Sequence, residues 1–349
     1  MSLAMKRFLA VYSLAAGALL TATAACGTTG PGDGDGYGSG LGTPENPVPQ
    51  SADKGPYAVA SRVDFTVEAV LPAQAELVVV TLRAFADNPA KTLVTVADQA
   101  GVPAVKTLYD AIPSIIRDQL EGWINNEINK IKLNGITLPQ YAGEMAALAE
   151  TALTQFEIDS SLAIQPGTAT HTLTALDFSP AGIDAKLPIT GLAADVLTQH
   201  TTVTVGGAGA FTLGDQHFGL EYGEYAWQGI NMASTQLFGA DIRTTFDKAV
   251  NCPALAHTIA TKCVLNVCVG HETELNAICE GGLDAIVDTV HDRLAAMRAD
   301  VFRFISGNAR LVDDDQDGVA DRIVDGTWDG EMNLGMGLRK APATFTATR

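Results

Sequence analysis

The 349-residue sequence has few basic and few aromatic residues. It contains 22 Lys and Arg residues against 40 Asp and Glu residues, a net charge of −18, and no run of basic residues. Nucleic-acid binding needs clustered positive charge to contact phosphates, so we expect no nucleic-acid partner. Aromatic residues make up only 6% of the chain. The acidic surplus favours solubility and the binding of cations.

Long apolar runs and complete catalytic motifs are also missing. Beyond the first 25 residues, no stretch approaches the roughly 20 apolar residues that a membrane-spanning helix needs, so we expect no second span. His271-Glu272 begins the zinc motif H-E-x-x-H, but residue 275 is leucine, and the second histidine ligand is absent. We therefore expect a protein without a recognisable catalytic site.

The N-terminus has the three parts of an export signal. Lys6 and Arg7 are followed by an apolar stretch over 8–20, and then by Thr23-Ala24-Ala25 and Cys26. The last four residues resemble the lipobox of bacterial lipoproteins, although that family more often has leucine where this chain has threonine. The resemblance implies a signal peptide over 1–25 and a lipid (diacylglycerol and palmitate) on Cys26. The alternatives are an ordinary secretory signal with a chance cysteine, or a free N-terminal helix.

The residues after the cysteine predict a tether. Residues 27–42 contain eight glycines in 16 positions, and Pro44, Pro47 and Pro49 follow. Such a composition cannot bury a core, so we expect disorder over 26–54. By resemblance to enterobacterial sorting, Gly27 in place of aspartate implies the outer membrane. The folded part would then cover 55–349, either as one domain or as subdomains 55–215 and 216–349.

Hydrophobic periodicity divides the folded part into blocks of strand and blocks of helix. Alternation with period two predicts strands, and apolar residues three or four apart predict helices. We expect strands at 63–69, 156–164, 168–178, 201–205, 210–213, 301–312, 323–328 and 344–348. We expect helices within 72–88, 93–101, 103–112, 116–131, 141–152 and 223–300. Segregated blocks of this kind favour an α+β fold with an antiparallel sheet.

The four other cysteines form a symmetric pattern. Cys252, Cys263, Cys268 and Cys279 are separated by 11, 5 and 11 positions. A helical hairpin would place the outer pair opposite each other and likewise the inner pair. Because export leads to an oxidising compartment, we predict the nested disulfides Cys252–Cys279 and Cys263–Cys268. The alternatives are the two other connectivities, or a zinc site made by Cys263, Cys268, His271 and Cys279.

The strongest chemical motif is an acidic loop, Asp313-Asp314-Asp315-Gln316-Asp317-Gly318-Val319-Ala320-Asp321. Carboxylates at alternate positions and a glycine at the turn suit calcium, which takes six to eight oxygen ligands. The loop resembles those of EF-hands, dockerins and thrombospondin type 3 repeats. The predicted ligands are Asp313, Asp315, Asp317, the carbonyl of Val319, Asp321 and, in place of the glutamate that an EF-hand has nearby, Asp325. The strand-like flanks predict a calcium-clamped β-turn with a structural role. The alternative is a solvated acidic turn.

These features lead to three functional hypotheses. The first is a membrane-anchored, calcium-stabilised envelope lipoprotein that acts as a non-enzymatic binding or structural module, with an envelope protein as partner. The second is a carrier of lipid or another apolar ligand in a groove between helices and sheet, loosely similar to the tubular lipid-binding domains of the bactericidal/permeability-increasing type. The third is a hydrolase with His217 as its base, near Asp215, Glu221, Tyr222 and Glu224. The alternative for this last cluster is a strand surface followed by an acidic helix N-terminus.

Overall fold

The computed structural model describes residues 49–349, except residue 54 and residues 65–72, 179–183 and 334–336. All described residues belong to one compact unit, Pro47–Arg349. The predicted signal peptide, Cys26, almost all of the predicted tether and residues 65–69 of the first predicted strand therefore lie outside the described residues.

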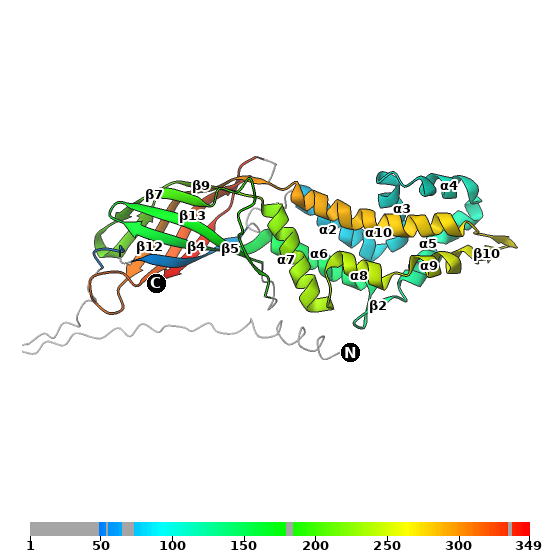
Figure 1. Ribbon diagram of the computed structural model, residues 1–349, viewed down its shortest axis with the longest axis horizontal. Helices are drawn as coiled ribbons and strands as arrows, with labels where there is room; N and C mark the ends of the chain where they lie inside the picture. The colour runs from blue at the N-terminus through cyan, green and yellow to red at the C-terminus, as the bar shows by residue number, and fades with distance from the viewer. Residues whose placement is uncertain (1–48, 54, 65–72, 179–183, 334–336) are drawn as a thin grey trace, which may run out of the picture. The chain divides into compact units, whose positions relative to one another are not determined.

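An eight-stranded antiparallel sheet closes into a barrel (Figure 1). Its strands, in the order in which they pair, are β13 (Arg322–Met332), β15 (Ala343–Thr348), β1 (Pro56–Asp64), β4 (Gln155–Gln165), β5 (Thr168–Asp177), β7 (Thr198–Val205), β8 (Ala210–Leu213) and β12 (Ala299–Val312). The pairing of β12 with β13 completes the ring. Three further strands extend it: β6 (Lys186–Pro188) on β5, β9 (Gln216–Leu220) on β12, and β14 (Arg339–Lys340) on β13.

The antiparallel sheet is confirmed, but its closure was not predicted. Strands from both predicted subdomains, 55–215 and 216–349, take part in the same ring. The first strand begins at Pro56, before the predicted start at residue 63. Its exposed positions include Ala58 and Ala60, and its buried positions include Ser61, so the contrast between polar and apolar residues is weak there. The predicted hairpin of β7 and β8 is confirmed, with Val203 opposite Leu213.

Large aromatic side chains fill the interior of the barrel. The ring of Trp328 stacks on Phe304 and Phe345, with centroid distances of 4.3 and 4.4 Å. Its indole N–H donates to Ser61 Oγ at 3.1 Å, so the buried polar atom is satisfied. Gly307 lies opposite Trp328 on β12, and a Cβ there would be 2.4 Å from the indole ring. A glycine at this position therefore makes room for the largest side chain of the core.

A buried histidine links three strands inside the barrel. His171, on β5, is 1% exposed, and its Nδ1–H donates to the amide oxygen of Gln216 at 2.5 Å. Its Nε2 accepts from the hydroxyl of Ser160 at 2.7 Å. Burial lowers the pKa of His171 to about 4, although the hydrogen bond to Gln216 opposes the shift. The imidazole is therefore neutral at pH 7.

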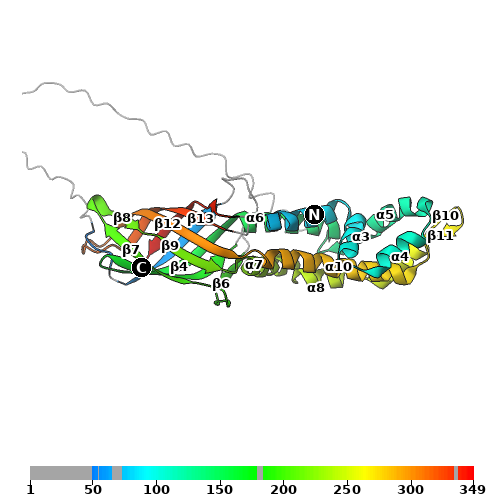
Figure 2. The same cartoon turned by 90° about the horizontal axis from the view of Figure 1, so that it is seen from above.

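Nine helices are found in the described residues, and they gather apart from the barrel (Figures 1 and 2). They are α2 (Ala73–Asp87), α3 (Pro89–Gln99), α4 (Pro103–Ala111), α5 (Ser114–Ile128), α6 (Leu138–Thr154), α7 (Tyr222–Phe238), α8 (Ile242–Ala249), α9 (Cys252–Ala260) and α10 (Glu272–Ala295). Shorter pieces are β2 (Lys132–Leu133) with β3 (Ile136–Thr137), β10 (Cys263–Val264) with β11 (Val267–Cys268), and the 3-10 turn η2 (Gly207–Gly209). The predicted helical blocks are confirmed, with capping side chains such as Asn88 and Asp241 at helix starts.

The helices join the barrel at one end. Helix α6 runs directly into β4, β9 runs into α7, and α10 precedes β12 by three residues. At this junction Gly223 of α7 packs against the backbone of α10, where a Cβ would lie 1.6 Å from the carbonyl oxygen of Leu294. The hydroxyl of Tyr222 donates to the carbonyl of Ala152 at 3.2 Å. Because β12 starts at the junction, the loop between β12 and β13 lies at the opposite end of the barrel.

The buried histidine predicts a pH dependence of stability. The pKa of His171 is about 4 in the folded chain and about 6.5 when exposed, so only the unfolded chain gains a proton between these values. The contribution to stability is complete above pH 6.5 and is lost as the pH falls to 4, by up to about 3 kcal/mol. Urea unfolding at several pH values should show this slope in the wild type and a weaker slope in His171→Gln. The exposed His200→Gln should keep the wild-type slope, and an unchanged slope in His171→Gln contradicts the assignment.

Candidate metal centre

The acidic loop joins the two strands that close the barrel. It covers residues 313–321, between the end of β12 at Val312 and the start of β13 at Arg322. The flanking strands expected from the sequence are confirmed. Gly318 has a φ of +87°, a conformation that glycine adopts without strain, and this lets the chain reverse between the strands.

Three carboxylates converge in this loop. Asp313, Asp315 and Asp317 each offer an oxygen, and these oxygens lie within 4.8 Å of one another. Backbone amides orient all three: Gly318 N–H donates to Asp313 Oδ2 at 2.8 Å, Asp317 N–H to Asp315 Oδ1 at 3.2 Å, and Val319 N–H to Asp317 Oδ1 at 2.9 Å. The loop backbone thus holds together three groups that repel one another when ionised.

Asp313 is the most informative member of the group. Asp313 is 6% exposed, and its Oδ1 atom is buried without a hydrogen-bond partner in the described part of the chain. A buried carboxylate oxygen without a donor or a positive charge costs free energy, because it has lost its hydration. A cation bound between the three carboxylates would supply the missing interaction.

The other two aspartates of the loop are neutralised by arginines. Asp314 accepts from Arg322 Nε and Nη2, both at 2.6 Å, and this contact lowers the pKa of its carboxyl group. Asp321 accepts from the amide of Asp314 at 2.8 Å and from Arg349 Nε at 3.0 Å. The amide and Arg349 lower the pKa of Asp321 as well. These pairs leave Asp313, Asp315 and Asp317 as the carboxylates that face one another.

The other residues predicted as ligands lie differently. The carboxylate of Asp321 faces Arg349 and the amide of Asp314. Asp325 belongs to β13, where its carboxylate accepts from Arg310 at 3.1 Å. Val319 forms a parallel bridge with Ser51. Neither Asp321 nor Asp325 belongs to the group that could hold a metal ion.

Both ends of the folded unit meet at this loop, which the sequence did not predict. Gln50 N–H donates to the carbonyl of Gly318, and Ala320 N–H to the carbonyl of Ser51, both at 2.9 Å. The hydroxyl of Tyr57 donates to the carbonyl of Ala320 at 2.5 Å, and burial raises the pKa of this tyrosine to about 12. Gln50 and Ser51, predicted as disordered tether, therefore belong to the fold, because their backbone groups have partners in the loop.

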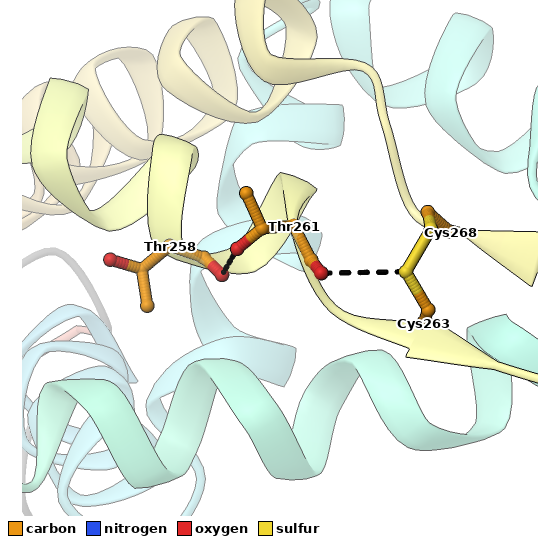
Figure 3. The surroundings of a disulfide bond; sticks show 4 residues. All are labelled: Thr258, Thr261, Cys263 and Cys268. Atoms are coloured by element: carbon orange, nitrogen blue, oxygen red, sulfur yellow. Dashed lines mark hydrogen bonds between the residues drawn. A yellow bond between two sulfur atoms is a disulfide. The ribbon is translucent and has the colours of Figure 1, made fainter. Parts of the chain in front are cut away.

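The cysteine pairing is as predicted. Cys252 bonds to Cys279, which links the start of α9 to α10, and Cys263 bonds to Cys268 across the β10–β11 turn. Figure 3 shows the second bond beside the end of α9, where the sulfur of Cys263 lies 3.4 Å from the carbonyl oxygen of Thr261. With every one of these sulfurs in a disulfide, the alternative zinc site has no thiolate ligands in this structure.

The residues around His217 do not form one site. His217 Nε2 lies 3.0 Å from Asp215 Oδ2, and both residues are exposed. Arg303 also donates to this carboxylate, and it lowers the pKa of Asp215 to about 2. Tyr222 is buried, and Glu224 lies 3.4 Å from His291. The predicted cluster is thus divided between a strand surface and the helix junction.

No family model, curated protein or solved structure matches the chain. In the part of the chain that the structure describes, no helix combines the length and the apolar character needed to cross a membrane.

The two disulfides should differ in their effect on stability. They span 27 and 5 positions, and the loop-entropy relation gives contributions of about 3.5 and about 2 kcal/mol. Cys252 and Cys279 are also buried, whereas Cys263 and Cys268 are exposed. In urea unfolding, the double variant Cys252→Ala/Cys279→Ala should lose more stability than Cys263→Ala/Cys268→Ala. An equal or reversed order counts against this account.

Proposed function

We propose that the chain is a calcium-stabilised envelope lipoprotein, held by lipid on Cys26, whose folded unit is a non-enzymatic binding or structural module. One observation carries the calcium part: the buried Oδ1 of Asp313 lacks a hydrogen-bond partner in the described residues and belongs to a group of three carboxylates. Calcium fits this donor set because it is a hard cation that prefers carboxylate oxygens. Carbonyls and water would complete its six to eight ligands.

Export and anchoring are supported by separate features. The N-terminal sequence carries the signal pattern and the lipobox-like cysteine. The two disulfides agree with an oxidising compartment, where such bonds persist. Extracytoplasmic fluids also commonly hold calcium at concentrations that fill weak sites, near 10⁻⁴–10⁻³ M. By the sorting resemblance of Gly27, the proposed location is the outer membrane.

A packed module is better supported than a carrier of apolar ligands. A carrier needs internal space, and ligand pockets measure roughly 300–1,000 Å³. The barrel interior holds Trp328, Phe304 and Phe345 in stacked contact. An apolar cavity between the helices, lined by residues such as Leu93 and Ile278, measures about 30 Å³. That volume has room only for molecules about the size of water and is far smaller than a ligand pocket.

Thermal unfolding tests the calcium site. Calcium about 100-fold above its dissociation constant contributes about 3 kcal/mol, so it should raise the melting temperature of the full chain by about 5 °C relative to EDTA. Asp315→Asn removes a ligand and also one repelling charge. It should melt at or above the wild type in EDTA and show no response to calcium.

The control for this experiment is Asp329→Asn, which removes one exposed carboxylate from β13 outside the loop. It should respond to calcium as the wild type does. A wild type with the same melting temperature in calcium and in EDTA rejects the proposed calcium-stabilised site.

Fractionation tests the anchor. The wild-type chain expressed in a bacterium should be found in the membrane fraction and should incorporate radiolabelled palmitate, because several acyl chains hold a protein firmly in a bilayer. Cys26→Ser should incorporate no label and leave the membrane fraction, while Cys263→Ser should remain labelled. Label on Cys26→Ser, or none on the wild type, contradicts the anchor.

A further inference from the structure

We infer that the acidic loop is a cation-dependent clasp, which fastens the start of the folded unit to the end of the barrel where β12 and β13 are joined. This inference rests on the proposed calcium site and adds a consequence of its occupation. Its basis is that Gln50 and Ser51 bond to the same loop that carries the three carboxylates.

The clasp is built from backbone contacts on the two sides of Val319. The carbonyl of Gly318 accepts a hydrogen bond from Gln50 N–H, and the N–H of Ala320 donates to the carbonyl of Ser51. Both donor–acceptor distances are 2.9 Å. Between them, Ser51 and Val319 form a parallel bridge. Gly318 and Val319 also donate their own amides to Asp313 and Asp317. One short backbone segment therefore orients both the carboxylates and the N-terminal residues.

Side-chain burial shows that the contact is packed. Ala52 is 2% exposed, and Ala320, with which the hydroxyl of Tyr57 bonds, is fully buried. Asp321 of the same loop accepts hydrogen bonds from Nε and Nη2 of Arg349, which follows β15. The loop thus contacts both the beginning and the end of the folded unit.

Repulsion among the three carboxylates links the contact of the N-terminal residues to the binding of a cation. Without a positive charge between them, Asp313, Asp315 and Asp317 repel one another, and opening the loop relieves that repulsion. Opening moves Gly318 and Ala320 away from Gln50 and Ser51, so the N-terminal segment is released. With the cation bound, the carboxylates are held together and both backbone bonds form.

Amide hydrogen exchange of the full chain in detergent tests the clasp. In calcium the amide protons of Gln50 and Ala320 should be protected, and in EDTA they should exchange at least about tenfold faster. The amide of Leu173, which bonds to the carbonyl of Leu197, serves as the internal control and should change little. A uniform acceleration of all amides means that calcium stabilises the barrel as a whole, and this contradicts a local clasp.

The mutual effect of calcium binding and the N-terminal contact can be measured in a second experiment. If calcium strengthens the N-terminal contact, that contact must strengthen calcium binding by the same factor. Gln50→Pro removes the N–H that bonds to Gly318 and should weaken calcium binding at least about fivefold in isothermal titration calorimetry. Gln50→Ala keeps the N–H and should bind as the wild type does.

The outcomes separate this inference from the proposed function. If the wild type binds no calcium, the proposed site fails and the clasp fails with it. If it binds calcium, but Gln50→Pro binds equally well and the exchange of Gln50 is the same in calcium and EDTA, the site stands and the clasp is rejected. Weaker binding by Gln50→Pro together with local protection supports both.

Discussion

The closure of the barrel depends on the pairing of β12 with β13, and the loop between these strands concentrates negative charge at the turn. Three carboxylates within 4.8 Å of one another oppose the compact loop unless a cation balances them. The chain neutralises the two remaining aspartates with Arg322 and Arg349, which leaves a defined group of three. A change in the stability of this loop therefore changes the stability of the closed ring and of the N- and C-terminal segments that bond to the loop.

The helical part is organised around other constraints. Helices and barrel meet through short connections at one end, where Gly223 allows α7 and α10 to touch. Far from this junction along α10, two disulfides hold α9 and the β10–β11 turn. The acidic loop and the disulfides thus lie in opposite parts of the unit. Disulfides persist in oxidising compartments outside the cytoplasm, where calcium is also plentiful, and both conditions agree with the export that the sequence predicts.

Local patterns predicted the elements better than they predicted their assembly. The alternation in Phe156–Ile164 and the helical spacing of Leu283–Met297 indicated β4 and α10, because both patterns reflect which face is buried. The cysteine spacing indicated the disulfides. The closed ring could not be predicted, since besides the pairing of β12 with β13 it needs the pairing of β1 with β15, which joins residues far apart such as Ala58 and Thr348.

In the candidate site too, groups that are close in sequence could be predicted, whereas contacts between residues far apart could not. The motif identified Asp313, Asp315 and Asp317, because the ligands of such a loop are close in sequence. It also included Asp321, whose partner Arg349 lies 28 positions away, and no local signal indicated that pair. The contact of Gln50 with Gly318 joins segments more than 250 positions apart, within a stretch whose composition predicted disorder.

X-ray diffraction from crystals grown in calcium tests the central claim most directly. The account predicts an anomalous-scattering peak with oxygens of Asp313, Asp315 and Asp317 at about 2.3–2.6 Å, and with Gln50 still bonded to the loop. A loop without an ion at millimolar calcium, in which ordered water or a protein donor satisfies Oδ1 of Asp313, would contradict it.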